Sequence, residues 1–142
     1  MLFVTTFKSE NHCDRVVVIW AASTETYMPI CELHEHLDTF ESELLKAGTE
    51  YVAPSMCYAY AALAECVPFI NGAPALTVDF PAMWELAEKT QTPICGKDYK
   101  SGQTMMKTVL APAFHSRLLG LSGWFSTNIL GNRDGEVLDD PA

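Results

Sequence analysis

The chain has 142 residues, of which 49% are hydrophobic and 19% charged, which fits one globular domain with a core and excludes a disordered chain. Its net charge of -9 includes only nine Lys and Arg residues, which argues against a nucleic-acid partner because such binding depends on clustered basic side chains. No apolar run approaches the roughly 18 residues of a membrane-spanning helix, and no basic segment precedes a long apolar one at the N-terminus, so we expect a cytoplasmic protein without a membrane partner.

The first half of the chain alternates between strand and helix patterns. Residues 16–20, Val-Val-Val-Ile-Trp, are rich in β-branched side chains and predict a strand covered on both faces, as in a parallel sheet. A helix is predicted next, and Gly48 supplies its end. The apolar residues at helical spacing in it are Leu33, Leu37, Phe40 and Leu44. A second helix is predicted from Pro54–Ser55, and residues 67–70 predict a short strand that ends in the turn Asn71-Gly72.

The second half continues the alternation. The sequence predicts a third helix around residues 80–87, a third strand at 93–95, a fourth helix from Ser101 and a fourth strand at 118–125. Strands separated by helical segments of about ten to fifteen residues are typical of right-handed βαβ crossovers. We therefore expect a Rossmann-like α/β fold with a mostly parallel sheet and flanking helices. The first twelve residues carry little pattern.

The cysteines and histidines do not predict a metal site. The five cysteines are odd in number and contain no C-x-x-C pair, which favours reduced, mostly buried thiols over disulfides or zinc ligands. His34 and His36 flank Glu35, a pattern that invites a metal interpretation. Residues two apart on a helix do not face each other, so we expect both histidines on the surface of the predicted helix.

Ligands of such folds bind outside the carboxyl ends of the strands. Four turns of this chain qualify, at residues 21–26, 71–74, 96–104 and 127–135. In the third turn, residues 101–104 provide a hydroxyl at the N-cap of a predicted helix, followed by a glycine and two further polar side chains. Free N–H groups and the positive end of the helix dipole at this position would favour a phosphate. The alternative is an ordinary N-cap with a tight turn.

Two familiar nucleotide motifs are absent. A P-loop needs four residues between its glycines and a lysine after the second, whereas five residues separate Gly96 from Gly102 and Gln103 stands at the lysine position. The dinucleotide fingerprint G-x-G-x-x-G does not occur in the chain either. If NAD binds, glycines that hold its phosphates must come from elsewhere.

Five segments match, in order, those of one enzyme family. Residues 16–25 and the segment from Pro54 through the helix at 58–63 resemble two of its elements. Residues 67–74 match V-P-[FY]-I-N-G-S-P except that Ala73 replaces the serine. Residues 96–104 match G-[DKR]-D-x-K-[ST]-G-[QE]-T, and residues 128–135 match N-x-[LF]-G-N-x-D-G. From about Asp14 to Pro141 the chain therefore resembles the middle of an inositol-phosphate synthase, of the prokaryotic type.

The resemblance implies a function and roles for particular residues. Residues 1–126 would be the second part of a Rossmann-like NAD-binding domain, and residues 127–142 the start of the catalytic and oligomerisation domain. The residues implied to bind the NAD cofactor are Ala21, Ala22, Ser23, Thr24, Gly72 and Ala73. Those implied to bind the substrate, glucose 6-phosphate, are Ser101, Gly102, Gln103, Thr104 and Asn128. Catalytic roles are implied for Asp98, Asn132 and Asp134.

In this family NAD oxidises C5 of glucose 6-phosphate, a proton leaves C6, C6 attacks C1, and the hydride returns to give 1D-myo-inositol 3-phosphate. The resemblance implies that the family's catalytic lysines lie beyond Ala142, so we expect the 142-residue chain alone to be inactive. Members of the family form tetramers. Lys107 is expected in solvent, and Lys100 either helps to neutralise the phosphate or is simply exposed.

Two other function classes remain open. One is a different Rossmann-type oxidoreductase acting on a phosphorylated sugar, which would release NADH where a synthase would not. The other is a non-catalytic module that binds a phosphosugar or NAD, which would show affinity without turnover.

Overall fold

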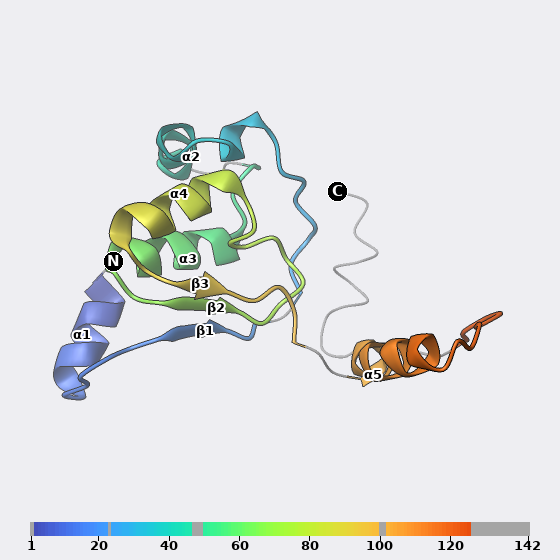
Figure 1. The fold of residues 1–142 in the computed structure, drawn as a ribbon. Helices are drawn as coiled ribbons and strands as arrows, with labels where there is room; N and C mark the ends of the chain where they lie inside the picture. The colour runs from blue at the N-terminus through green and yellow to red at the C-terminus, as the bar shows by residue number, and fades with distance from the viewer. Residues whose placement is uncertain (1, 23, 47–49, 100–101, 126–142) are drawn as a thin grey trace.

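The computed structural model describes residues 2–22, 24–46, 50–99 and 102–125 (Figure 1). Three short strands, β1 (Val18–Trp20), β2 (Phe69–Asn71) and β3 (Ile94–Cys95), form a parallel sheet in the order β1-β2-β3. Trp20 pairs with Asn71, and Ile70 pairs with Cys95. The carboxyl ends of all three strands therefore lie at one edge, which confirms the predicted α/β fold with a parallel sheet.

Most helices lie where apolar spacing predicted them. The elements are α1 (Leu2–Glu10), the 3-10 turn η1 (Glu32–His34), α2 (Leu37–Leu44), α3 (Pro54–Ala64), α4 (Pro81–Thr90) and α5 (Gly102–Ser116). Both α3 and α4 begin with proline, whose fixed φ suits the first position of a helix. The helix α1 lies in residues whose sequence carried little pattern. Among the described residues, no helix combines the length and the apolar character needed to cross a membrane.

The core lies on one side of the sheet, where α3 and α4 pack and α2 contacts α4 (Figure 1). Phe69 is fully buried, and Val18 packs against the same cluster. Alternate residues of a strand point to opposite faces, and Val17 and Ile19 on the other face are 49% and 56% exposed. Coverage of both faces was predicted, but among the described residues only one face is covered.

His34 is fully buried, so its predicted surface position was wrong. Its Nδ1 accepts a hydrogen bond from the Cys31 N–H at 3.1 Å, which leaves Nε2 to donate to the Tyr51 carbonyl at 2.8 Å. The imidazole also packs edge-on against Phe80, with ring centres 5.1 Å apart. The α-helix starts only at Leu37, and the 3-10 turn before it directs His34 inward.

The cysteines are free, as expected, but the prediction that most are buried was wrong. Cys13 and Cys31 are half-buried, and Cys57, Cys66 and Cys95 are exposed. The exposure of Cys95 is explained by the one-sided sheet, because Cys95 ends β3 and lies on the uncovered face.

The predicted strand at residues 118–125 is not formed. Helix α5 extends away from the sheet (Figure 1), and residues 119–125, which follow it, have no regular structure. Leu118 and Phe125 are each 93% exposed. A strand is stabilised by hydrogen bonds to a neighbouring strand, and in the described residues this segment pairs with none.

Candidate functional site

The turns that follow the three strands meet at the carboxyl edge of the sheet. The Gly72 N–H donates to the Trp20 carbonyl at 2.8 Å, which joins the end of β1 to the turn after β2. The Tyr99 N–H donates to the Gly72 carbonyl at 3.3 Å, which joins the turns after β2 and β3. Three of the four turns expected to hold ligands are therefore contiguous.

Two glycines make this close approach of backbones feasible. Gly96 has a φ of +92°, and a Cβ there would collide with the carbonyl oxygen of Asn71. A Cβ at Gly72 would lie 2.9 Å from the Trp20 carbonyl oxygen and would also collide with the Tyr99 ring. A side chain at either position would push the turns apart, so the sequence permits this packing only with glycine.

Asn71 lies buried between two of these turns. Its Oδ1 accepts from the Ala73 N–H at 3.0 Å, and its Nδ2 donates to the carbonyls of Ala75 at 2.8 Å and Lys97 at 3.3 Å. Nothing in the local sequence predicted the long-range bond to Lys97, because 26 residues separate the partners.

A second connection, which is partly buried, fixes the turn after β1. Glu25 accepts two hydrogen bonds from Ser55, from its N–H at 2.9 Å and from its hydroxyl at 2.5 Å. The hydroxyl of Thr77 donates to Ser55 Oγ at 2.9 Å, and both hydroxyl residues are fully buried. The carboxylate therefore caps the N-terminus of α3 and holds the turn that contains Ala21 and Ala22.

The same carboxylate acts on Cys57, in the first turn of α3. Burial raises the pKa of the Cys57 thiol, the nearby negative charge of Glu25 raises it further, and the thiol's own backbone N–H lowers it. The thiol is therefore protonated at neutral pH and is a poor nucleophile.

The described site residues differ in exposure. Ala21, Ala22, Asp98 and Thr104 are exposed, whereas Ala73 is buried and its N–H is already bonded to Asn71. Gly102, Gln103 and Thr104 form the first turn of α5, where Gly102 has a φ of +51°. Five implied site residues lie outside the described residues, namely Ser23, Ser101, Asn128, Asn132 and Asp134.

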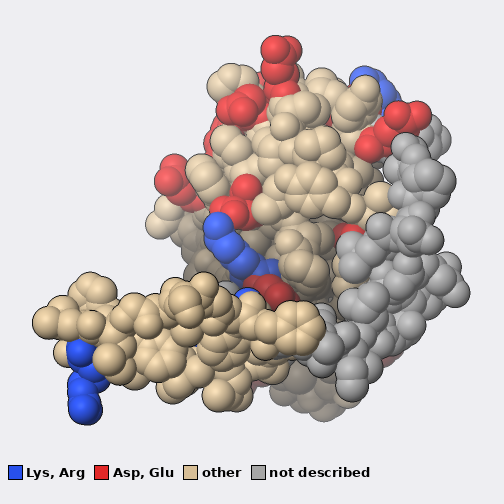
Figure 2. Space-filling model, turned by 90° about the vertical axis from the view of Figure 1, so that its right-hand side faces the viewer, with Lys and Arg blue, Asp and Glu red and all other residues tan. Residues whose placement is uncertain are grey.

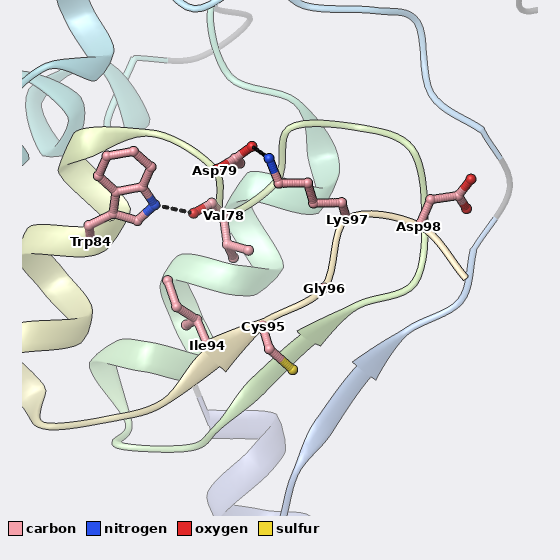
Figure 3. A pocket seen from close by; sticks show the side chains of 8 residues that line it. All are labelled: Val78, Asp79, Trp84, Ile94, Cys95, Gly96, Lys97 and Asp98. Atoms are coloured by element: carbon pink, nitrogen blue, oxygen red, sulfur yellow. Dashed lines mark hydrogen bonds and ion pairs between the residues drawn. The ribbon is translucent and has the colours of Figure 1, made fainter. Parts of the chain in front are cut away.

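A cavity of about 400 Å³ lies beside the turn after β3, on its α4 side (Figure 3). Trp84 donates its indole N–H to the Val78 carbonyl at 3.0 Å on one side of it. Lys97 pairs with Asp79 at 2.6 Å across its rim, while the Asp98 side chain points away from Lys97. Of the implied site residues that the structure describes, Asp98 alone lines this cavity.

The charge at this end of the molecule is uneven. Figure 2 looks onto the carboxyl edge and shows acidic side chains over the main body, whereas the arm formed by α5 presents none. Residues 102–125 contain Lys107 and Arg117 but no Asp or Glu. Lys107 is exposed as expected, and its Nζ lies 5.9 Å from the centre of the Trp124 ring.

Comparison with known proteins identifies the family. A family model for NAD binding, described as myo-inositol-1-phosphate synthase, matches residues 3–138. The chain belongs to the inositol-phosphate synthase family. The family resemblance and its cofactor, NAD, are thereby confirmed.

Relatives share both the sequence and the fold. The chain is 63% identical over 135 residues to inositol-3-phosphate synthase 1 of Bacteroides thetaiotaomicron, covering 95% of the chain and 32% of that protein. It is 41% identical over 140 residues to inositol-3-phosphate synthase of Saccharomyces cerevisiae, covering 97% of the chain and 26% of that protein. The crystal structure of the Caenorhabditis elegans inositol-3-phosphate synthase superposes with a TM-score of 0.74 at 31% identity, covering 80% and 22%. The chain thus spans a third or less of these synthases.

The described residues at the carboxyl edge of the sheet are compatible with a bound cofactor. Three small residues lie at the carboxyl edge, as close approach of a cofactor requires: Ala21 and Ala22 are exposed, and Gly72 is half-buried. The indole N–H of Trp20, the residue before Ala21, is buried and has no hydrogen-bond partner among the described residues. Buried donors are normally paired, so an acceptor from a bound group at this position would be favourable.

Proposed function

We propose that this chain is the central segment of an inositol-3-phosphate synthase that converts glucose 6-phosphate into 1D-myo-inositol 3-phosphate. The observation that carries the proposal is the meeting of three family-matched turns at one edge of a parallel sheet. Family membership supports NAD as the cofactor, which would bind at this edge, and the exposed polar groups after β3 would provide contacts for a sugar phosphate.

The turn after β1 would hold NAD through Ala21, Ala22, Ser23 and Thr24, together with Gly72 and Ala73. NAD, when bound, supplies the hydride acceptor and donor for the redox steps at C5. Ala73 would contribute through shape, because its methyl group is buried and its N–H is occupied. Glu25 would keep this turn in place through its bonds to Ser55.

The start of α5 would hold the substrate phosphate. Gly102, Gln103 and Thr104 lie where the N-terminus of α5 offers N–H groups, and Ser101, which precedes them in sequence, would join them. Residues 102–125 add positive charge without any acid. Asp98, whose exposed side chain comes from the turn just before, would act beside the nicotinamide. Asn128, Asn132 and Asp134 would bind substrate hydroxyls and orient the reacting groups.

The remaining features of the proposal concern the whole enzyme. Residues 1–126 would complete a Rossmann-like NAD-binding domain, and residues 127–142 would begin the catalytic and oligomerisation domain. The enzyme would be a cytoplasmic homo-oligomer, a tetramer as in the family. The lysines that stabilise the enolate and aldol oxyanions would come from outside these residues.

The test is a chimera in which this chain replaces the matching segment of the Bacteroides thetaiotaomicron synthase, a substitution that the 63% identity makes feasible. We expect the chimera to form inositol phosphate from glucose 6-phosphate with added NAD and without net NADH release. We expect the 142-residue chain alone to form none. A folded chimera that binds NAD but forms no inositol phosphate would reject the proposed function, and steady NADH accumulation would indicate an oxidoreductase instead.

A further inference from the structure

Asn71 uses its whole side-chain amide to bond backbone groups. It ends β2, is 2% exposed, and contacts three backbone groups through Oδ1 and Nδ2. A carboxamide offers two N–H donors and one carbonyl acceptor, so each of its hydrogen-bonding groups has a partner here. A bond of this kind in a buried position is costly to break, because the partner left behind stays desolvated.

These bonds join two turns that come from different parts of the chain. Ala73 and Ala75 belong to the turn after β2, whereas Lys97 belongs to the turn after β3 and directly precedes Asp98. The backbone of Gly96 also lies directly against the Asn71 carbonyl. The Asn71 side chain therefore helps to set the spacing between the turns, together with the backbone bond from Tyr99 to Gly72.

The turn after β3 is also held by an ion pair, which is weaker than the Asn71 bonds. The Lys97–Asp79 ion pair is 2.6 Å long, but the lysine side chain is 76% exposed, and ion pairs in water contribute little. Asn71 is 2% exposed, so the 3.3 Å bond from its side chain to the Lys97 carbonyl is less accessible to solvent than the ion pair.

We propose that Asn71 is a positioning residue of the synthase, which holds the turn of Asp98 at a fixed distance from the cofactor turn at Gly72 and Ala73. This inference rests on the proposed function, because it assumes that NAD and the reacting sugar meet between these turns. Asn71 itself is buried, and its side chain is bonded to backbone groups rather than directed at a ligand. It acts on hydride transfer only through the placement of Asp98 relative to the nicotinamide.

The test compares Asn71→Asp and Asn71→Ser in the chimera. Aspartate keeps an acceptor for the Ala73 N–H but turns a charged oxygen toward the carbonyls of Ala75 and Lys97. Serine introduces no charge and is too short to reach Lys97, so it serves if the aspartate variant does not fold. The matched control is Asn11→Asp, the same chemical change at an exposed asparagine bonded only locally, to the Phe7 carbonyl.

We expect kcat to fall by about 10- to 100-fold, since misplacement of a reacting group by about 1 Å can have an effect of this size. The stoichiometry of NAD binding should be unchanged. The kinetic isotope effect on kcat/KM with glucose 6-phosphate deuterated at C5 should increase, because misplacement slows hydride transfer itself. The isotope effect is a ratio of two rates of the same enzyme sample, so it does not depend on the fraction of enzyme that is folded. An isotope effect equal to that of the unmutated chimera would overturn the proposal.

A second measurement separates this inference from the proposed function. In the 142-residue chain, the Tyr99 amide should exchange with deuterium at least about tenfold faster in Asn71→Ser than in Asn11→Asp, because its bond to Gly72 depends on the link between turns. Equal exchange would refute positioning by Asn71 whether or not the enzyme is a synthase. Faster exchange combined with an inactive unmutated chimera would reject the proposed function and leave the structural link established.

Discussion

At the scale of single residues, Tyr60 shows how burial and a carboxylate act together on one proton. Its hydroxyl, on α3, donates to Glu41 Oε1 on α2 at 2.8 Å. Burial is the largest cause that raises the pKa of Tyr60 from 10.0 to about 12, followed by this hydrogen bond and by the charge of Glu41. The neutral phenol is therefore favoured more in the folded chain than in the unfolded one.

The sign of the pH dependence follows from this shift. The stabilisation from the neutral phenol is complete below pH 10.0 and is lost as the pH rises toward about 12. We predict that Glu41→Gln lowers the pKa of Tyr60 but leaves it above its ordinary value, because the burial remains. Absorbance titration of the phenolate, with Tyr60→Phe subtracted in each background, measures this value. Identical titrations with and without Glu41 would show that the carboxylate has no effect.

At the scale of elements, four helices end in the same way without glycine. His12, Cys66, Gln91 and Leu118 follow α1, α3, α4 and α5 with φ values between 51° and 55°. In each case the next N–H bonds to the carbonyl five residues earlier, at 2.9 to 3.0 Å. This is the Schellman arrangement, in which glycine is the preferred residue.

We predict that Cys66→Gly raises the free energy of unfolding by about 1 kcal/mol, because glycine adopts positive φ without the strain of a Cβ. Cys66→Ala removes the same thiol but keeps the strain, so it is the matched control. Urea unfolding of both variants measures the difference. A glycine variant no more stable than the alanine variant would show that the left-handed position carries no strain.

Element prediction from the sequence succeeded where the signal is local and failed where it is not. The apolar run at residues 16–20 and the proline-led helix α3 depend on neighbouring residues, and both were found. The strand predicted at 118–125 needs a partner strand, which no local pattern guarantees. His34 is buried by contacts with Tyr51 and Phe80, which are distant in sequence.

In the candidate site, too, local features could be predicted from the sequence and long-range contacts could not. The positions of the turns could be predicted, because each follows a recognisable strand. The links from Glu25 to Ser55 and from Asn71 to Lys97 could not be predicted, because each joins residues 26 or more apart. Motif residues such as Gly72 and Asp98 were found through the resemblance, whereas the residues that hold them in place required the structure.

At the scale of the whole molecule, the sheet has two unequal faces. Phe69 and the helices above it form the core, whereas Val17 and Ile19 on the other face are about half exposed. The same kind of apolar strand residue should therefore contribute very differently to stability, according to the face from which it projects.

We predict that Phe69→Ala lowers the free energy of unfolding of the 142-residue chain by about 3 to 5 kcal/mol, since it leaves a cavity in the core. Ile19→Thr keeps the branch at Cβ that suits a strand. It should lower the free energy of unfolding by no more than about 0.5 kcal/mol, as is usual for surface changes. Urea unfolding followed by circular dichroism measures both changes. If Ile19→Thr destabilised the chain as much as Phe69→Ala, both faces of the sheet would have to be covered in solution, and the one-sided core described above would be wrong.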